Sequence, residues 1–429
     1  MKAFDEAHQE RLELAAAGFA ADLVRERQRE KLDRLWDRLA DVPYYRHRSW
    51  AQERSLDGAP VTPKAALKNA PEEFLRSGVG PYYRYYETSG STGVPTPTPR
   101  LAMDMVWNTA SVSALWALSM RPGDRVASLL PSDVVPVGDL VATASEYLGC
   151  TLLRCYPFSQ GITDWDRLEA LFDRFRPEHV FAAPGVLLQW TRILKKRGRL
   201  DDVRSSVRSL MLLGEVSTSA LRARLAEQWQ AEALDVSYGS TETGTIAASC
   251  PLDRLHLLAH GFAAEILEDG RLWAAEPGRS GELVVTTLNN YARPLVRYST
   301  GDLVSVGDCP CGLGLPVLTV HGRAADQIVV AGVEISAGQV EDVVYGTAGV
   351  TGYLVQLKRS DPTAARLVLE RDVDFSQSTD AVCASVSERF AAGLGVQLTQ
   401  VVMVDQLPQT TKAGGSQKNW KRTNVQWVD

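Results

Sequence analysis

The sequence predicts an α/β fold: a large N-terminal α/β domain that includes a β subdomain, followed by a small α+β C-terminal lobe. Three observations lead to this prediction. Apolar runs alternate with amphipathic stretches over residues 125–238, short β runs without helical patterns fill 262–321, and residues 327–429 combine both patterns. Strands that alternate with helices indicate a largely parallel sheet covered by helices. The turn-rich stretch 321–326 sets the expected domains at 1–322 and 327–429.

Each element follows from its local pattern. Residues 1–45 carry apolar side chains at helical spacing among many charges, which predicts a surface helix packed on a core. The strands expected in the parallel sheet are 125–130, 150–155, 179–183, 207–213 and 233–238, separated by helices at 138–148, 165–175, 186–194 and 219–230. The β subdomain is expected to hold strands at 283–287, 303–306 and 317–320. The C-terminal lobe is expected to hold strands at 353–357 and 367–369 and a helix at 379–392.

Composition excludes several classes of protein. The 429 residues are 45 % apolar and 23 % charged, the balance of a globular protein. A net charge of -6 does not favour a nucleic-acid partner, whose binding surface would be basic. The acidic start of the chain lacks the apolar core of a signal peptide, and no apolar run reaches the ~18 residues of a membrane span. We therefore expect a cytoplasmic protein, and six scattered cysteines fit that expectation.

The densest signal for function is a loop of hydroxyl and glycine residues after Thr88. Its members are Ser89, Gly90, Ser91, Thr92 and Gly93. Glycines let the backbone approach a phosphate and point N–H groups at it, and hydroxyls donate further hydrogen bonds. No lysine follows as it does in the Gly-Lys-Ser/Thr nucleotide loop. Taken alone, such a stretch is also typical of a flexible surface loop.

An ordered series of motifs distinguishes between these alternatives. The loop is followed by Ser237-Tyr-Gly-Ser-Thr-Glu-Thr243, Arg297-Tyr-Ser-Thr-Gly-Asp302, Gly322-Arg-Ala-Ala-Asp-Gln-Ile328 and Leu407-Pro-Gln-Thr410. This series resembles the adenylate-forming superfamily of acyl-CoA synthetases and adenylation domains. Residues 39–46, 60–64 and 309–312 are most similar to the phenylacetate–CoA ligase family.

The resemblance implies an ATP site. In this family a carboxylate attacks the α-phosphate of ATP, and donors and a metal ion neutralise the phosphate charge. The loop 89–93 resembles the family's phosphate cradle, although Thr96 stands where a lysine is common. Tyr238 would stack on adenine, Thr241 would contact the α-phosphate, and Glu242 would hold Mg²⁺. The alternative is a turn at a strand end with an exposed glutamate.

The remaining nucleotide contacts are also implied by the resemblance. Asp302, expected at the start of a strand, would accept hydrogen bonds from both ribose hydroxyls, and Arg323 would reach the ribose or phosphate. Lys418 is our first choice for the closing lysine that contacts the α-phosphate and the acid, and Lys412 is the second. The C-terminal lobe rotates in this family and is expected to be mobile. Its hinge would be Asp326 or a shifted position, because Ala325 replaces the usual charged residue.

Four residues indicate a metal site. Cys250, His256, Cys309 and Cys311 form a three-thiolate, one-imidazole set of the kind that binds structural zinc. Relatives of the phenylacetate–CoA ligase type show a similar set. The alternative is that the cysteines are small buried apolar residues.

The acid pocket is placed by position in the family's fold. Its walls are expected to come from Asp133, Pro184, Gly214, Glu215, Gly239 and Tyr85, with Tyr86 beside them. Glycines here would leave a flat slot suited to an aryl ring. Asp133 would recognise an amino or hydroxyl substituent on that ring, or it is a helix N-cap or solvent-facing turn residue.

The expected function is activation of a small aromatic carboxylic acid with ATP and Mg²⁺ and transfer of the acyl group to coenzyme A. The superfamily also uses carrier proteins and amines as acceptors, and these alternatives stay open. A regulator that keeps the AMP site without catalysis also stays open, because Thr96 replaces a lysine and the tail 407–421 is irregular. Family members are often dimers, which leaves a homodimer open.

Overall fold

The computed structural model describes residues 2–88, 95–215, 217–323, 327–330, 332–359, 361, 364–407 and 425–428. These residues form two compact units. The first consists of Met1–Asp124, Pro131–Leu152 and Asp235–His321, and the second of Arg125–Leu130, Leu153–Leu234 and Gly322–Asp429. The domain boundary expected near residue 322 stays a prediction.

The first unit opens with two helices where the sequence predicted one. Helix α1 (Lys2–Ala16) ends before Gly18 and Phe19, whose φ angles of 57° and 55° break the helix, and α2 (Ala21–Leu39) follows. The corner between them is held by the amide of Gly314, which donates to the carbonyl oxygen of Gly18 at 3.0 Å. A side chain at Gly314 would lie 2.4 Å from the Phe19 carbonyl oxygen, so only glycine allows this approach.

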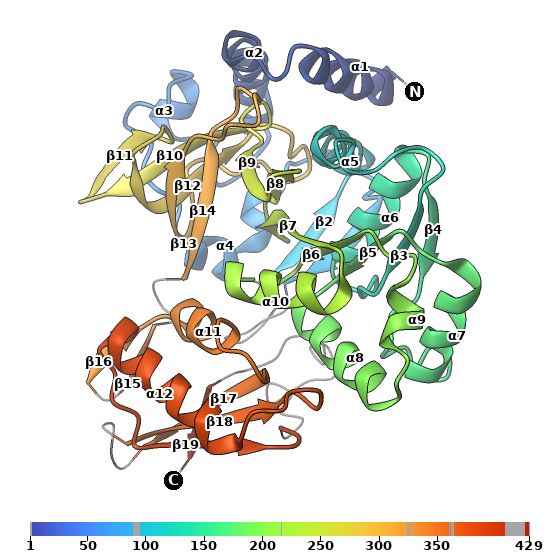
Figure 1. Cartoon of the computed structure of the whole chain (residues 1–429). Helices are drawn as coiled ribbons and strands as arrows, with labels where there is room; N and C mark the ends of the chain where they lie inside the picture. The colour runs from blue at the N-terminus through green and yellow to red at the C-terminus, as the bar shows by residue number, and fades with distance from the viewer. Residues whose placement is uncertain are drawn as a thin grey trace. The chain divides into compact units, whose positions relative to one another are not determined.

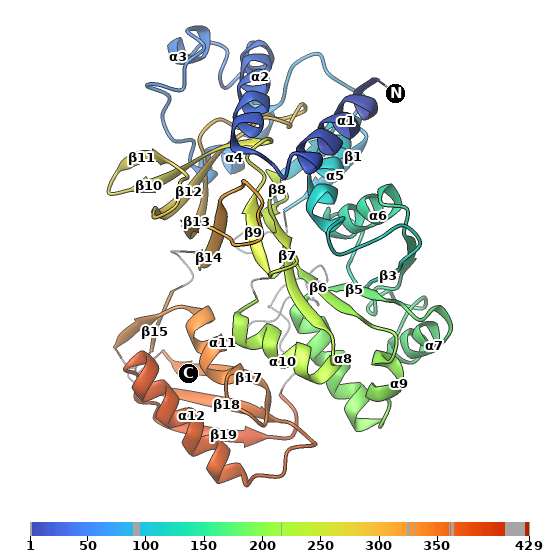
Figure 2. The ribbon, with the colours of Figure 1, turned by 45° about the horizontal axis from the view of Figure 1, so that its top comes forward.

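Short helices, one β-hairpin and two longer helices follow in the first unit. They are α3 (Ser49–Gln52), α4 (Lys64–Asn69), the 3₁₀ turn η1 (Pro71–Phe74), the hairpin of β1 (Arg84–Glu87) and β2 (Pro97–Arg100), α5 (Ala102–Trp116) and α6 (Val137–Tyr147). Helix α5 packs against α1, α6 and β8 (Figure 2). Its last residue, Trp116, is buried and donates from Nε1 to the Val236 carbonyl oxygen at 2.9 Å.

The first unit also contains the β subdomain that the sequence predicts at 262–321, and three strands that precede residue 262 extend it. Its strands lie in the order β11 (Arg271–Ala274), β10 (Phe262–Glu268), β12 (Ser280–Thr287), β13 (Tyr298–Gly307), β14 (Val317–Arg323), β9 (Arg254–Leu257), β8 (Gly244–Cys250) and β7 (Glu232–Ser240). The pairs β10/β11, β10/β12, β12/β13, β9/β14, β8/β9 and β7/β8 are antiparallel. Helices are absent from this run of described strands, as expected.

Four of the five predicted parallel strands have at least half of their residues in the second unit, and the fifth, predicted at 233–238, is β7, which pairs antiparallel with β8. β3 (Arg125–Ser128) pairs with β5 (His179–Ala182), β5 pairs with β6 (Ser209–Leu213), and β4 (Thr151–Arg154) lies next to β3. Between them run α7 (Trp165–Phe175), α8 (Pro184–Lys196), α9 (Leu200–Arg204) and α10 (Ser219–Trp229). Strands β5 and β6 are buried throughout, as parallel strands covered on both faces must be.

The C-terminal lobe belongs to the second unit. It consists of β15 (Ile328–Val330), β16 (Val333–Ile335), α11 (Ala337–Tyr345), β17 (Val350–Lys358), β18 (Ala365–Arg371), α12 (Thr379–Leu394), β19 (Gln400–Val404) and β20 (Val425–Val428). Strands β19, β18, β17 and β20 form a four-stranded sheet, and α12 lies along it (Figure 1). Among the described helices of the chain, none has both the length and the apolar character needed to cross a bilayer.

Candidate active site and metal cluster

Two of the expected nucleotide contacts meet directly. Tyr238 lies near the end of β7, and its hydroxyl donates to Asp302 Oδ2 at 2.8 Å. Asp302 lies in the middle of β13, not at a strand start as the sequence predicted, because β13 already begins at Tyr298. The two residues are 64 positions apart in the chain. The fold therefore places the aromatic ring expected under adenine beside the carboxylate expected at the ribose.

The turn between β7 and β8 carries Thr241 and Glu242. Glu242 is only 4 % exposed, so the alternative of an exposed turn glutamate is wrong. Arg100 donates from Nη2 to the carbonyl oxygens of Thr241 at 2.8 Å and Glu242 at 3.1 Å. Asn290 donates to the same Glu242 carbonyl oxygen at 3.3 Å. The backbone of this turn is thus held by buried donors.

Two buried arginines near Glu242 were missed by the sequence reasoning. Arg293 is 1 % exposed and donates to the Pro97 carbonyl oxygen at 2.5 Å and to Thr98 Oγ1 at 2.8 Å. Burial, together with the positive charge of Arg100, lowers the pKa of Arg293 to about 10, and Glu242 opposes that shift. Arg100 and Arg293 thus place positive charge near Glu242. No local pattern marks either arginine, because their partners lie in distant segments.

Thr96 forms hydrogen bonds at the base of the expected phosphate loop. Its amide donates to Thr88 Oγ1 at 2.9 Å, and the amide of Thr88 donates to the Thr96 carbonyl oxygen at 3.2 Å. Thr88 and Thr96 therefore fasten the two ends of the loop together. The loop residues Ser89–Gly93 lie outside the described residues, and so do Lys412, Lys418, Ala325 and Asp326. Arg323 is exposed at the end of β14. The roles of all these residues stay predictions.

Gly239 is required by packing within the sheet. A side chain there would lie 2.2 Å from the Gly244 carbonyl oxygen on β8. Asn108 of α5, which the sequence reasoning missed, accepts a hydrogen bond from the Thr245 amide at 2.8 Å. Close backbone approach therefore already accounts for the glycine, and its contact with an aryl ring stays a prediction.

The other expected acid-pocket residues differ in exposure. Asp133 is exposed in a bend and does not cap α6, whose N-cap is Pro136. Tyr85 is 55 % exposed. Tyr86 is buried, with its hydroxyl donating to Asp139 Oδ2 at 2.9 Å, so it offers no free aromatic surface. This leaves Tyr85 as the tyrosine that could contribute to an acid pocket in the first unit.

Part of the expected pocket wall lies in the second unit. Pro184 is the first residue of α8, and the amide of the next residue, Gly185, donates to Glu215 Oε2 at 3.3 Å. Gly214 has a φ of 89°, which favours glycine. The hydrogen bond from Gly185 therefore holds the Glu215 carboxylate at the start of α8. The acid pocket as a whole stays a prediction.

The four expected metal ligands come together. The ligand atoms of Cys250, His256, Cys309 and Cys311 all lie within 4.8 Å of one another. Cys250 Sγ lies 3.8 Å from Cys309 Sγ, and Cys311 Sγ lies 3.3 Å from His256 Nε2. Sulfur atoms bound about 2.3 Å from a tetrahedral zinc ion would be about 3.8 Å apart. The cluster therefore has the spacing of a structural zinc site.

The protonation chemistry of the cluster also fits a metal. His256 Nδ1 donates to the Leu315 carbonyl oxygen at 2.9 Å, which leaves Nε2 with its lone pair toward the thiols. Burial lowers the pKa of His256, so the imidazole stays neutral as a ligand must. Burial and the neighbouring thiols raise the pKa of Cys311 to about 11, and a bound cation would displace that proton.

Comparison with known proteins identifies the family. Residues 13–291, more than half of the chain, match the AMP-binding enzyme family. The chain belongs to the AMP-binding enzyme family. This AMP-binding enzyme is 28 % identical to a phenylacetate-coenzyme A ligase of Thermus thermophilus, over 82 % of this chain and 81 % of the relative. The resemblance to the adenylate-forming superfamily is thereby confirmed, and the protein is an enzyme of the adenylate-forming acid–CoA ligase family.

Solved structures confirm the fold of this AMP-binding enzyme. A 2-hydroxyisobutyryl-CoA ligase in the postadenylation state, in complex with 2-HIB-AMP, matches with a TM-score of 0.81 and 17 % identity over 95 % of this chain and 90 % of that one. The same ligase with CoA in the thioesterification state matches with a TM-score of 0.65 and 18 % identity over the same shares. The mixed α/β architecture with a small C-terminal sheet is therefore that of adenylating enzymes.

Proposed function

We propose that this enzyme activates a small aromatic carboxylic acid with Mg²⁺-ATP as its acyl-AMP and then transfers the acyl group to coenzyme A. The observation that carries the proposal is the hydrogen bond of 2.8 Å between Tyr238 and Asp302, because it joins the two motifs expected to hold the nucleoside. The phenylacetate-coenzyme A ligase similar over 82 % of the chain supports an aromatic acid and coenzyme A as acceptor.

The first step joins the acid to AMP. A carboxylate oxygen of the acid attacks the α-phosphorus of ATP, the bond from that phosphorus to the bridging oxygen breaks, and pyrophosphate leaves with the electron pair. Tyr238 would stack on adenine, and Asp302 has two oxygens, so it can keep the Tyr238 hydroxyl and also accept from the ribose hydroxyls. Thr241 and the loop 89–93 would donate to the phosphates, and Lys418 or Lys412 would approach the α-phosphate and the acid.

Glu242 is the residue that fits a magnesium ion. Mg²⁺ prefers one or two carboxylates together with phosphate oxygens, and the carboxylate of Glu242 stands on a turn fixed by Arg100. The ion would neutralise phosphate charge as pyrophosphate leaves. Arg100 and Arg293 add permanent positive charge near Glu242, which would partly replace the lysine absent at Thr96.

The second step releases AMP. The thiolate sulfur of coenzyme A attacks the carbonyl carbon of the acyl-AMP, the bond to the phosphate oxygen breaks, and AMP leaves with that electron pair. Asp133, Gly239 and Tyr85 of the first unit are proposed to contact the aryl group. Asp133 would select acids with an amino or hydroxyl substituent.

We also propose that Cys250, His256, Cys309 and Cys311 hold a structural zinc ion. Four protein ligands close a tetrahedral site and leave no position for a reacting water, so the ion would take no part in catalysis. It would join the end of β8 and β9 to the loop between β13 and β14.

A pyrophosphate assay tests the proposed function. The purified protein is incubated with ATP, Mg²⁺ and benzoic, phenylacetic, cinnamic or amino-hydroxybenzoic acid, with and without coenzyme A. We expect acid-dependent ATP–pyrophosphate exchange with at least one acid, and an acyl-CoA product detected by mass spectrometry when coenzyme A is present. Replacing the closing lysine by alanine should abolish exchange, so Lys418→Ala and Lys412→Ala serve as each other's control.

Two other outcomes would indicate a different acyl acceptor or a protein without catalysis. Exchange without any acyl-CoA would indicate a carrier protein or an amine as acceptor. Absence of acid-dependent exchange with every acid, in a protein that still binds AMP, would contradict the proposal and indicate a regulator.

A further inference from the structure

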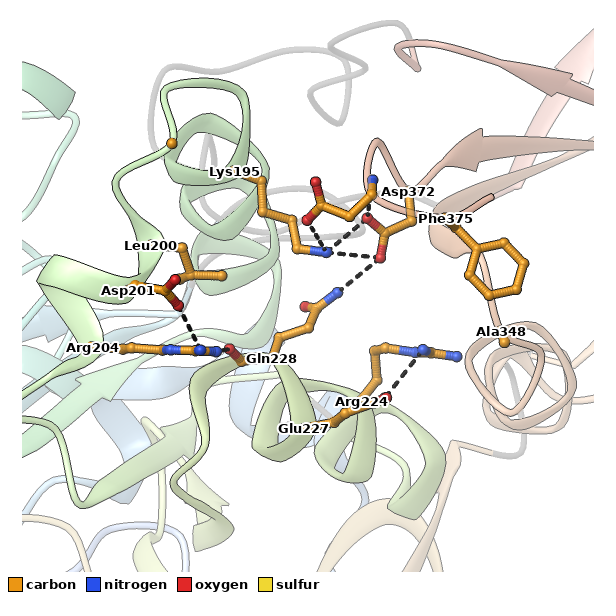
Figure 3. A pocket seen from close by; sticks show the side chains of 12 residues that line it. Lys195, Leu200, Asp201, Arg204, Arg224, Glu227, Gln228, Ala348, Asp372 and Phe375 are labelled. Atoms are coloured by element: carbon orange, nitrogen blue, oxygen red, sulfur yellow. Dashed lines mark hydrogen bonds and ion pairs between the residues drawn. The ribbon is translucent and has the colours of Figure 1, made fainter. Parts of the chain in front are cut away.

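Within the second unit, the C-terminal lobe meets α8 and α10 through opposite charges. Helix α8 contributes Arg192 and Lys195, and the lobe contributes Glu370 at the end of β18 and Asp372 just after it. Figure 3 shows Lys195 and Asp372 pointing toward each other. The cations therefore lie on the helical side of this contact and the anions on the lobe.

The two ion pairs are close and poorly exposed. Arg192 Nη1 contacts Glu370 Oε2, and these side chains are 12 % and 2 % exposed. Lys195 Nζ lies 2.7 Å from Asp372 Oδ1 and 2.9 Å from Oδ2, and 3.1 Å from Asp374 Oδ2. Removing one member of such a pair would leave its partner as an uncompensated charge away from water.

Helix α10 adds polar contacts beside these pairs. Arg224 Nη2 donates to the carbonyl oxygens of Tyr345 at 3.3 Å and Thr347 at 2.8 Å. Gln228 Nε2 donates to Asp372 Oδ2 at 3.4 Å (Figure 3). Arg192, Lys195, Arg224 and Gln228 thus contact the lobe through ion pairs and hydrogen bonds, which depend on the orientation of the lobe.

A cavity of about 500 Å³ runs along the same contact, and Lys195, Arg224, Gln228 and Asp372 line it (Figure 3). The cavity borders the Lys195–Asp372 pair, and Arg192 and Glu370 do not line it. Burying ion pairs adds little net stability compared with apolar packing, but it fixes orientation. Contacts between domains are more polar than permanent interfaces, which fits surfaces that meet and part repeatedly.

We propose that Arg192–Glu370 and Lys195–Asp372 form a latch that holds the C-terminal lobe on α8 during one chemical step and releases it for the other. This rests on the proposed two-step function. The 2-hydroxyisobutyryl-CoA ligase matches this chain with a TM-score of 0.81 in its postadenylation state and 0.65 in its thioesterification state. The latch residues act by positioning the lobe and contact no reacting atom.

The test compares the two half-reactions in latch variants. In Arg192→Gln and Glu370→Gln, the rate of ATP–pyrophosphate exchange and the rate of thioester formation from added acyl-AMP are measured separately. We expect their ratio to change about tenfold, the usual range for coupling between two states. The charge-exchanged variant Arg192→Glu/Glu370→Arg should return the ratio toward that of the wild type.

Arg197→Gln is the matched control. Arg197 lies just after α8 and pairs with Asp166 and Glu169 on α7, so this variant removes an ion pair without touching the lobe. Its ratio of half-reactions should stay that of the wild type. An unchanged ratio in Arg192→Gln and Glu370→Gln would overturn the latch.

Hydrogen exchange separates failure of the latch from failure of the proposed function. Amides in α8 and β18 should exchange faster in Arg192→Gln than in the wild type, and Arg197→Gln should leave β18 unchanged. This measurement needs no substrate, so it holds even if the wild type shows no pyrophosphate exchange. Unchanged exchange in both elements of the Arg192→Gln protein would also overturn the latch.

Discussion

At the scale of single residues, Tyr238 and Asp302 are hydrogen-bonded to each other but are expected to hold different parts of the nucleoside. Variants of each residue test the two roles separately. Asp302→Asn keeps the size of the side chain but removes the charge expected to accept the ribose hydroxyls. We expect its KM for ATP to rise about tenfold or more, because hydrogen bonds to charged groups contribute about 1.5–3 kcal/mol. Tyr238→Phe keeps the ring and should change the KM for ATP by less than about threefold.

The measurement is ATP–pyrophosphate exchange at varied ATP and saturating acid. Asp269→Asn, on the exposed turn between β10 and β11, is the control and should behave as the wild type. A normal KM for ATP in Asp302→Asn would remove Asp302 from the nucleotide site.

Glu341 on α11 gives a pH-dependent stability. Its Oε1 accepts a hydrogen bond from the Thr218 amide at 3.0 Å. Burial, with the charges of Glu215 and Asp342, raises the pKa of Glu341 from 4.5 to about 7. The folded protein therefore binds a proton that the unfolded chain loses, so the stabilisation is complete below pH 4.5 and is lost as pH rises through about 7.

We expect Glu341→Gln to remove this loss, because the amide resembles the protonated acid and can still accept from Thr218. Urea unfolding at about pH 5 and about pH 8 should show a smaller difference in the free energy of unfolding for the variant than for the wild type. Glu334→Gln, at the exposed position of β16, should leave the difference unchanged. An equal pH dependence in Glu341→Gln and wild type would rule out the protonated carboxyl.

At the scale of elements, the proposed zinc ion connects strands that are far apart in the chain. We expect about one zinc ion per chain by metal analysis, and we expect a chelator to lower Tm by about 5–10 °C, because metal binding contributes directly to folding. Cys309→Ser should lower Tm by a similar amount and reduce the zinc content.

Cys383→Ser on α12 is the control, because Cys383 lies outside the cluster. A protein that is purified without zinc, and whose Tm neither zinc nor a chelator changes, would show that the cysteines are ordinary buried thiols.

At the scale of the whole molecule, one buried ion pair joins the N-terminal helices to the rest of the first unit. Lys31 Nζ of α2 lies 2.5 Å from Glu10 Oε1 of α1, donates to the His260 carbonyl oxygen at 2.9 Å, and lies 4.3 Å from the centre of the Trp107 ring of α5. Lys31→Met leaves Glu10 buried without its partner. We expect it to lower the free energy of unfolding by about 3 kcal/mol.

Urea unfolding with two further variants tests this prediction. Lys31→Met/Glu10→Leu removes both charges and should recover most of the loss. Arg34→Met breaks the exposed pair with Glu6 and should cost less than about 1 kcal/mol. If Lys31→Met is as stable as the wild type, the pair is not needed to hold the helices.

The parallel part of the fold could be predicted from the sequence because its signals are local. The helix at α7 follows from helical periodicity, and the buried strands β5 and β6 follow from continuous apolar runs, each within a single segment. The break at Gly18 and Phe19 was missed because a positive φ leaves no mark in apolar spacing.

The site was predictable only where a motif carried it. Tyr238, Glu242 and the Cys/His set were singled out by such patterns, and the structure brings the cysteines and the histidine together. Their roles stay predictions. Arg100 and Arg293 were missed because their partners, the turn after β7 and strand β2, are distant in sequence. Long-range pairing of this kind depends on tertiary packing, which residue patterns do not encode.

The loop between β13 and β14 does two things at once. It carries Cys309 and Cys311, and through the Gly314 amide it supports the corner of α1 and α2 at Gly18. The beginning of the chain is thus anchored on the loop proposed to hold zinc, which is synthesised hundreds of residues later. During synthesis, the Gly314–Gly18 hydrogen bond that supports the corner of the first two helices could form only after this loop has emerged.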